Sequence, residues 1–338
     1  MRRTFCLILV LAVACGGAQK PSTPPPPLPA DAKPEPATPP PQAKADTKPE
    51  PPPEPPKPTG PIETTMPAAK VTVKLVAPGK GKRQALKLTA KPGSKQQVEL
   101  AMDFSGKQSA PAELGGVQEQ VAPTVVLVGD AEVQDVDKDG AAKFQLTVTG
   151  VDAKDQPGTK TPAAEFKADL VTLNGMTIAG TTAANGTTGD LTLHIEKPDD
   201  KSDNAVQMVK LSLLPMWPVL PTEPVGVGAK WQVASVQKIA DRLEVTNTVD
   251  WEVVAHKGNT WTLKGTSKLT GADQNIDGAQ FGSIAGNGTI DATLVDGAFV
   301  PATKISQTTD FTATAKTPDK TVSLQFHLLQ GNAVTPKP

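Results

Sequence analysis

Three aspartates followed by a glycine are the clearest candidate for metal chemistry in this sequence. Asp135, Asp137 and Asp139 alternate along the chain, and Gly140 follows them. Alternating carboxylates on a tight turn are typical of calcium loops, because Ca²⁺ takes several oxygen ligands. The position that would need a bidentate glutamate holds Leu146 instead. The pattern therefore favours a polar hairpin with an Asp-Gly turn, and calcium binding is the weaker alternative.

The other residues that could support catalysis are scattered. His194, His256 and His327 form no helical histidine pair. A zinc site would have to assemble them from distant strands. We expect His194 and His327 to be strand-face residues and His256 to be exposed to solvent. The sequence has no nucleophile elbow, phosphate loop or dinucleotide fingerprint. We therefore expect no metal, no cofactor and no enzymatic activity, with a hydrolase of unrecognised site as the less favoured alternative.

All four tryptophans lie in the second half of the chain, at Trp217, Trp231, Trp251 and Trp261. Such a cluster can fill the core of a sheet that has few other large side chains. It can also line a groove for an apolar or sugar ligand. We favour the core, and we take Trp217 as the best candidate for ligand binding because its segment is rich in proline.

The charge balance argues against a nucleic-acid partner. The chain has 34 basic and 35 acidic residues, and it has no tyrosine. A protein that binds nucleic acid usually carries an excess of positive charge on one surface. The composition shows no such excess.

The N-terminus indicates secretion and lipid attachment. Arg2 and Arg3 precede an apolar run that ends at Ala14, and Cys15 follows directly. The run has about ten residues, whereas a membrane-spanning helix needs about 20. Residues 11–15 resemble a bacterial lipobox, although Ala12 stands where leucine is usual. The resemblance implies a signal peptide over 1–14, a lipid on Cys15 as the membrane anchor, and transport to the outer membrane, since no aspartate follows the cysteine.

Residues 15–67 read as a lipidated cysteine and a disordered spacer. Most of the 35 prolines of the chain lie here, among alternating lysines and glutamates. Proline removes the backbone donor that helices and central strands need, and the segment has little apolar surface to bury. An extended polyproline conformation would reach on the order of 140 Å at ~3.1 Å per residue.

The remaining residues predict an all-β, antiparallel body. Apolar and polar residues alternate in many short runs, such as 71–76, 190–195 and 321–326. Period 2 with one polar face is typical of half-buried antiparallel strands. We predict two curved β-sheet units, half-barrel or sandwich-like, over 68–214 and 215–330, and a disordered tail over 331–338. A short helix near 111–120 is the one weak helical candidate.

Three pairs of motifs suggest that the two units are related. Residues 91–98 resemble 226–233, residues 136–140 resemble 254–258, and residues 175–180 resemble 282–286. The matches fall in the same order in both halves. They favour an internal duplication with its join near 214–224.

The segment from Trp217 to Trp231 contains the pattern LPxxPVxxGxxW. In this segment, with a lipobox and a proline-rich spacer before it, the chain resembles an uncharacterised family of β-rich bacterial lipoproteins typical of myxobacteria-like organisms. The resemblance implies a location in the cell envelope. It implies no activity and no functional residues.

Two hypotheses of function follow. In the first, the β body of an envelope lipoprotein binds a lipid or another apolar ligand, which requires a large apolar concavity. In the second, the body is a structural or protein-interaction module on a stalk, which requires a filled core and an exposed surface for an envelope protein.

Overall fold

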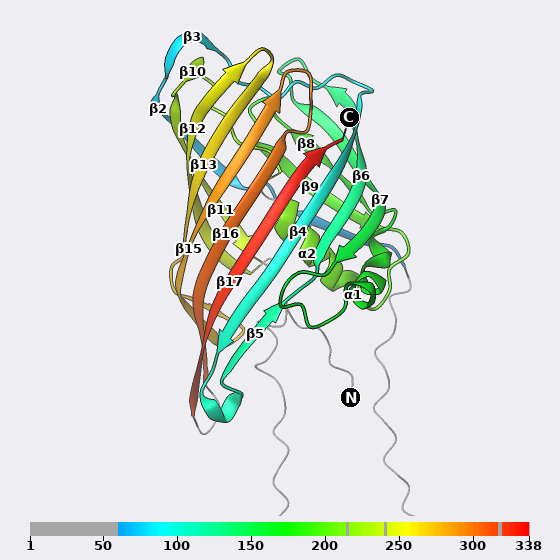
Figure 1. Cartoon of the computed structure of the whole chain (residues 1–338), viewed down its shortest axis with the longest axis vertical. Helices are drawn as coiled ribbons and strands as arrows, with labels where there is room; N and C mark the ends of the chain where they lie inside the picture. The colour runs from blue at the N-terminus through cyan, green and yellow to red at the C-terminus, as the bar shows by residue number, and fades with distance from the viewer. Residues whose placement is uncertain (1–59, 214–215, 240–241, 317–319, 338) are drawn as a thin grey trace, which may run out of the picture.

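One curled antiparallel sheet makes up most of the folded chain (Figure 1). A computed structural model describes residues 60–213, 216–239, 242–316 and 320–337. The main sheet has the order β1-β9-β8-β7-β6-β4-β17-β16-β15-β13-β12-β11-β2. The all-β, antiparallel class predicted from the period-2 pattern is confirmed. The predicted signal peptide, Cys15 and most of the spacer lie outside the described residues.

The first half of the sheet is an up-and-down meander, in which each strand pairs with the next one along the chain. Its strands are β4 (Lys95–Ser109), β6 (Thr124–Val136), β7 (Ala142–Lys154), β8 (Thr177–Thr182) and β9 (Thr188–Ile195). The short β5 (Val117–Val121) pairs with the far end of β4.

The second half repeats this meander with longer strands. They are β11 (Lys230–Ile239), β12 (Leu243–Lys257), β13 (Thr260–Thr270), β15 (Ala279–Val295), β16 (Ala302–Lys316) and β17 (Thr321–Pro336). The short β14 (Gln274–Ile276) pairs with β15. A separate two-stranded sheet joins β3 (Lys80–Gln84) to β10 (Val225–Val227).

The two meanders are joined along a central seam. The last strand, β17, pairs with β4 from Pro336–Val98 to Gln325–Ser109. At the outer edges, β1 (Ile62–Met66) pairs with β9, and β2 (Lys70–Ala77) pairs with β11. These two edge strands are successive in sequence, with only residues 67–69 between them. The sheet must therefore curl until its two edges come close, although β1 and β2 do not pair within the described residues.

Alternation along the strands places apolar side chains on the concave face. In β4, the buried residues are Val98, Leu100 and Met102. In β13, Trp261, Leu263 and Leu269 are buried, and the lysines between them are exposed. Burial of this face contributes about 25 cal/mol per Å² of apolar surface, so it favours the curled sheet. A second, smaller core contains Phe281, Phe311 and Phe326 near the opposite ends of the long strands.

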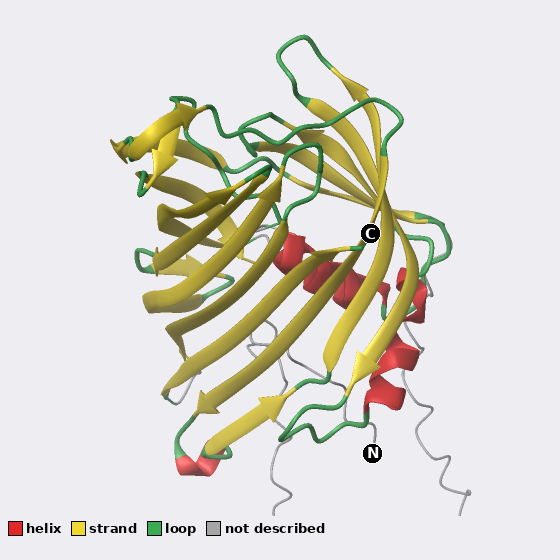
Figure 2. Ribbon diagram, turned by 45° about the horizontal axis from the view of Figure 1, so that its top comes forward, coloured by secondary structure: helices red, strands yellow, loops and turns green. Residues whose placement is uncertain are grey.

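Two helices lie between the strands in the chain, and one of them enters the concave side (Figure 2). α1 (Ala163–Leu170) follows β7, and α2 (Ser202–Leu213) follows β9. Val206, Val209 and Leu213 of α2 are buried in the main core. The carbonyl of Leu211 accepts a hydrogen bond from Nε2 of Gln330 in β17 at 3.1 Å. α2 therefore packs against the inner face of the sheet. No helix in the described ranges has the length and apolar character that a membrane crossing needs.

The repeated motifs occupy matching places in the two meanders. Val98 and Val233 lie in the first strands, β4 and β11. Gly140 and Gly258 lie at the turns after the second strands, and both have positive φ. The third motif pair reaches the fourth strands, β8 and β15. This correspondence is what a duplication requires. The division into units at residue 214 stays a prediction, because one sheet and one main core run through both halves.

Three local predictions are wrong. The predicted tail over 331–338 is ordered through Pro336, because β17 pairs there with β4. Residues 62–66, assigned to the spacer, form β1. The helix expected over 111–120 is a single 3-10 turn at Ala112–Leu114 followed by β5.

Candidate functional site

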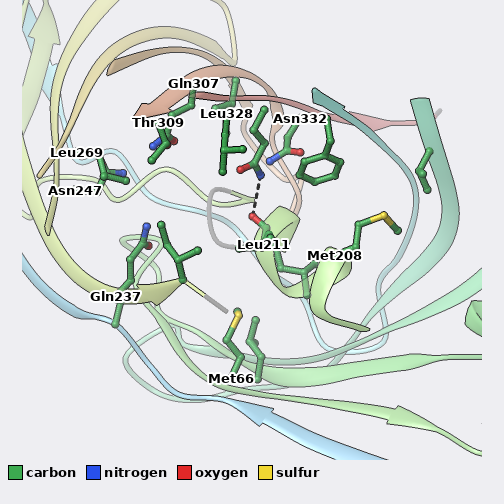
Figure 3. A pocket seen from close by; sticks show the side chains of 18 of the residues that line it. Met66, Met208, Leu211, Gln237, Asn247, Leu269, Gln307, Thr309, Leu328 and Asn332 are labelled. Atoms are coloured by element: carbon green, nitrogen blue, oxygen red, sulfur yellow. Dashed lines mark hydrogen bonds between the residues drawn. The ribbon is translucent and has the colours of Figure 1, made fainter. Parts of the chain in front are cut away.

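A large cavity lies between the concave face of the second meander and the helices. Its volume is about 1060 Å³. In Figure 3, Met66 lies on the opposite side of the hollow from Leu328, and Met208 lies near Leu211 of α2. The linker between β1 and β2 contributes Pro67, Ala68 and Ala69 to the wall. The same connection that brings the sheet edges together thus also lines the cavity.

The inner faces of the two meanders differ in polarity. The first is covered with apolar residues such as Leu127, Phe144 and Leu193, and α2 packs into it. The second carries a polar band, made of Ser235, Asn247, Ser267, Gln307, Thr309, Gln330 and Asn332. All of these except Ser267 line the cavity. The cavity therefore combines apolar walls with hydrogen-bonding groups.

Strand register places most of the polar band in two neighbouring rows, while Asn332 lies opposite Ile305. Gln330 lies opposite Gln307, Gln307 opposite Gly288, and Gly288 opposite Ser267. The next row runs through Leu328, Thr309, Gly286, Leu269, Asn247 and Ser235. A Cβ added at Gly288 would lie 2.5 Å from the Ser267 hydroxyl oxygen, so glycine is required for this close approach.

Several polar atoms in and beside the band have no hydrogen-bond partner. They are Oδ1 and Nδ2 of Asn332, Oδ1 of Asn247, Oγ of Ser267 and Oγ1 of Thr303. Asn332 is only 4% exposed. Leaving a buried polar group unpaired costs about 1–3 kcal/mol, and native proteins rarely do so without a reason. The unpaired atoms of Asn332, Asn247 and Thr303 can therefore bond to a polar group placed in the cavity.

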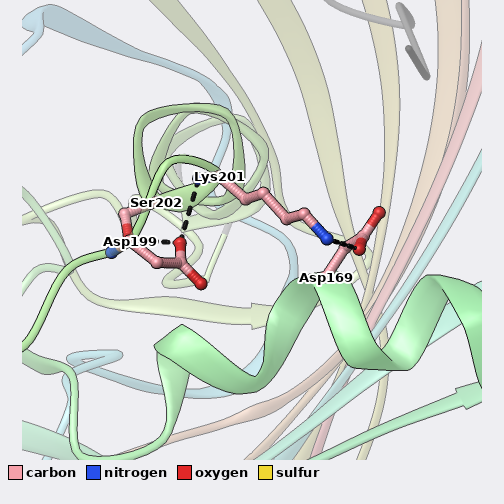
Figure 4. Close-up of polar contacts among 4 residues, drawn as sticks. All are labelled: Asp169, Asp199, Lys201 and Ser202. Atoms are coloured by element: carbon pink, nitrogen blue, oxygen red, sulfur yellow. Dashed lines mark hydrogen bonds and ion pairs between the residues drawn. The ribbon is translucent and has the colours of Figure 1, made fainter. Parts of the chain in front are cut away.

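Charged groups gather where α1 and α2 meet beside the cavity (Figure 4). Lys201 Nζ forms an ion pair with Asp169, and its backbone N–H donates to Asp199 Oδ1 at 2.9 Å. The hydrogen bond that Lys201 Nζ donates to the Asp169 carboxylate raises the pKa of Lys201 above its ordinary value of 10.5. This pair therefore stabilises the fold at and below pH 10.5, and the contribution is lost as the pH rises through the raised pKa. Lys201 and Asp169 both line the cavity.

Trp217 is both a core residue and part of the cavity wall. Its side chain is 6% exposed, and its ring centroid lies 4.9 Å from that of Phe144 and 5.6 Å from that of Phe299. Its indole N–H donates to the carbonyl of Phe299 at 3.3 Å. It also lines the cavity. The structure thus places the predicted binding residue at the cavity, with most of its surface in the core.

The other tryptophans are buried. Trp231 and Trp251 stack with centroids 6.1 Å apart, and Trp251 also reaches the cavity. Trp261 stacks on His256 at 3.7 Å, so His256 is half-buried instead of exposed as expected. Core filling, the favoured role of the cluster, describes all four.

The remaining histidines lie on strand faces, as expected. His194 lies 3.1 Å from Glu196, and His327 lies 2.7 Å from Asp310. Within the described ranges, no three acidic, histidine or cysteine side chains come together as a metal site.

The three aspartates shape a hairpin. Asp137 Oδ1 accepts hydrogen bonds from the backbone N–H groups of Asp139 at 2.9 Å and Ala141 at 2.8 Å. Asp135 Oδ1 accepts one from Val136 at 2.9 Å. These contacts close the turn between β6 and β7, with Gly140 at φ 84°. Asp137 already serves as a turn residue, as Asp commonly does.

We expect Asp137→Ala to lower the free energy of unfolding by about 0.5–1.5 kcal/mol, because the turn loses two side-chain hydrogen bonds. Urea unfolding measures this loss. Millimolar calcium should leave the Tm of both proteins unchanged. A calcium-dependent rise in Tm in the wild type that Asp137→Ala removes would restore the calcium hypothesis.

Comparison with known proteins adds little. No protein-family model matches the chain, and no curated protein matches it. Among solved structures, a crystal structure of OpdQ from Pseudomonas aeruginosa matches with 8% identity and a TM-score of 0.19. The match covers 72% of this chain and 98% of that one. A likeness at this level does not bear on function.

Proposed function

We propose that this protein is a non-enzymatic lipoprotein of the cell envelope that binds an elongated apolar ligand. The supporting observation is the cavity of about 1060 Å³ on the concave face. Sites for small molecules usually measure roughly 300–1000 Å³ and are mostly apolar with a few placed polar groups. The alternative, a structural or interaction module, required a filled core, whereas part of the inner face of the second meander borders this cavity.

The composition of the wall supports binding over chemistry. The polar band offers only hydroxyls and carboxamides, which donate and accept hydrogen bonds without titrating near neutral pH. Four charged residues also line the cavity: Lys201 and Asp169, which are paired with each other, and Glu165 and Asp200. Each methylene of a ligand that leaves water for such walls contributes about 0.8 kcal/mol.

We propose further that lipid on Cys15 holds the protein at the outer membrane and that the proline-rich spacer carries the body away from the surface. Support comes from the lipobox-like residues 11–15 and from the absence of other cysteines after Cys15 in the sequence. Multiple acyl chains on one residue give stable anchoring, whereas a single chain does not.

One variant tests both parts. We expect full-length Cys15→Ser, produced in the native host, to leave the membrane fraction and to lose fatty-acid labelling. Because this variant lacks the acylated cysteine, lipid found with it is bound without a covalent bond. Native mass spectrometry after purification without detergent should then show the protein with an added mass that organic solvent removes.

The two parts fail separately. Sedimentation of Cys15→Ser with membranes after a high-salt wash contradicts the lipid anchor. Soluble Cys15→Ser without any added mass contradicts ligand binding, and in that case the interaction module becomes the better account.

A further inference from the structure

We propose that the ligand is an uncharged lipid with an amide-linked chain, whose amide group lies at Asn332 with apolar chains on both sides. This inference rests on the proposed function and names the ligand class. It begins from the polar band, where Asn332 lines the cavity with both ends of its carboxamide unpaired.

The first step concerns charge. The polar band contains no lysine, arginine, aspartate or glutamate, so a charged headgroup placed there would lose its water without gaining a counter-ion. Burying an unpaired charge costs far more than burying a neutral polar group. Lys201, the lysine beside the cavity, is already paired with Asp169. The band therefore favours a neutral group.

The second step concerns donors and acceptors. Asn332 presents a free donor at Nδ2 and a free acceptor at Oδ1. A trans secondary amide carries one N–H and one carbonyl that point in opposite directions, so its N–H can donate to Oδ1 of Asn332 while its carbonyl accepts from another donor of the band. An ester offers a carbonyl acceptor only, and it would leave Oδ1 of Asn332 unpaired. An amide is therefore the better complement.

The third step concerns position. Apolar side chains border the polar band on both sides along the strands. Trp251, Ile290 and Ile305 line the cavity on one side. Phe281 and Phe311 line it on the other. An interior amide meets the band while its two chains extend along apolar parts of the wall.

Four compounds of matched chain length test the proposal against full-length Cys15→Ser. They are N-decyldecanamide, decyl decanoate, heneicosane and eicosanoate, each measured by displacement of a fluorescent apolar probe. We expect the amide to bind about tenfold more tightly than heneicosane, because it pairs buried groups that are otherwise unsatisfied. The ester should lie between them, and eicosanoate should bind no more tightly than the ester.

Asn332→Leu in the same background should remove the preference for the amide and should leave binding of heneicosane unchanged or tighter. This variant should fold, because it replaces an unsatisfied buried amide with an apolar group of similar size. Thr303→Val, which removes another unpaired oxygen next to the band, is a second variant of the same kind. The matched control is Asn287→Leu, since Asn287 is exposed on β15; it should keep the preference.

The outcomes are distinguishable. Three results would each overturn this inference while apolar binding stands. They are equal binding of the amide and heneicosane by Cys15→Ser with Asn332 intact, an unchanged preference for the amide in Asn332→Leu, and tightest binding of eicosanoate. Binding of none of the four compounds contradicts the proposed function itself.

Discussion

Replacing Trp217 with alanine is expected to lower the free energy of unfolding by about 3–5 kcal/mol, the usual range for truncating a buried tryptophan. The indole fills the space between Phe144 and Phe299, and its N–H is satisfied by the Phe299 carbonyl. Alanine leaves a void there and an unpaired carbonyl. Urea unfolding followed by far-ultraviolet circular dichroism measures the loss without relying on tryptophan fluorescence.

Two further variants define what Trp217 does. Trp217→Phe keeps an aromatic ring and should lose less than half as much stability as alanine. Val254→Ala truncates an exposed residue, 44% accessible, and should stay within about 0.5 kcal/mol of the wild type. A loss below about 1 kcal/mol for Trp217→Ala would mean that the ring is not a core element, and its place in the cavity wall would become its main role.

Gln307→Trp is expected to weaken ligand binding by about fiftyfold while the protein stays folded. Gln307 lines the cavity from β16 and faces Gly288, which has no side chain to oppose a larger residue. An indole there occupies space that the ligand needs. Each excluded methylene loses about 0.8 kcal/mol, so the loss of three weakens binding by about fiftyfold. The amount of ligand retained in native mass spectrometry measures the effect.

The neighbouring residue supplies the control. Ser306 precedes Gln307 in the same strand and is exposed on the other face of the sheet. Because successive side chains of a strand point to opposite faces, Ser306→Trp adds the same bulk outside the cavity. It should bind ligand as the wild type does. Equal loss of binding in both variants would show that the tryptophan perturbs the strand and that the cavity is not the site.

The sequence predicted the sheet because its signal is local. Alternation over 71–76 or 321–326 needs only neighbouring residues to show a half-buried strand. α2 was missed although Ala205, Val206, Val209 and Leu213 have helical spacing. Asp199, which accepts the Lys201 N–H at the start of α2, was a further helix signal. The segments on either side of α2 are rich in threonine and valine and predict strands, and this pattern obscured the helical spacing of the twelve residues of α2.

Most of the residues of the candidate site could not be predicted from the sequence. Its polar band joins Ser235, Asn247, Gln307 and Asn332, which are distant in the chain and meet only through strand register. Asn332 lies in residues that we predicted as a tail. Its strand, β17, pairs with β4, which is distant in the sequence, so no neighbouring residue indicates that pairing. Trp217, the candidate from the proline-rich segment, lies in the cavity wall, and its role in binding stays a prediction.

The seam between β17 and β4 sets the order in which the molecule can be completed. Val98 of β4 cannot form its pair until Pro336 of β17 is present. β17 is the last strand along the described chain and has sixteen residues. Until β17 arrives, β4 and β16 each keep an open edge, which another chain can pair with. Pairing across such sequence distances is slow. During synthesis, the interval before β17 emerges is therefore the period of greatest exposure to aggregation, and it is the period in which a chaperone has most to protect.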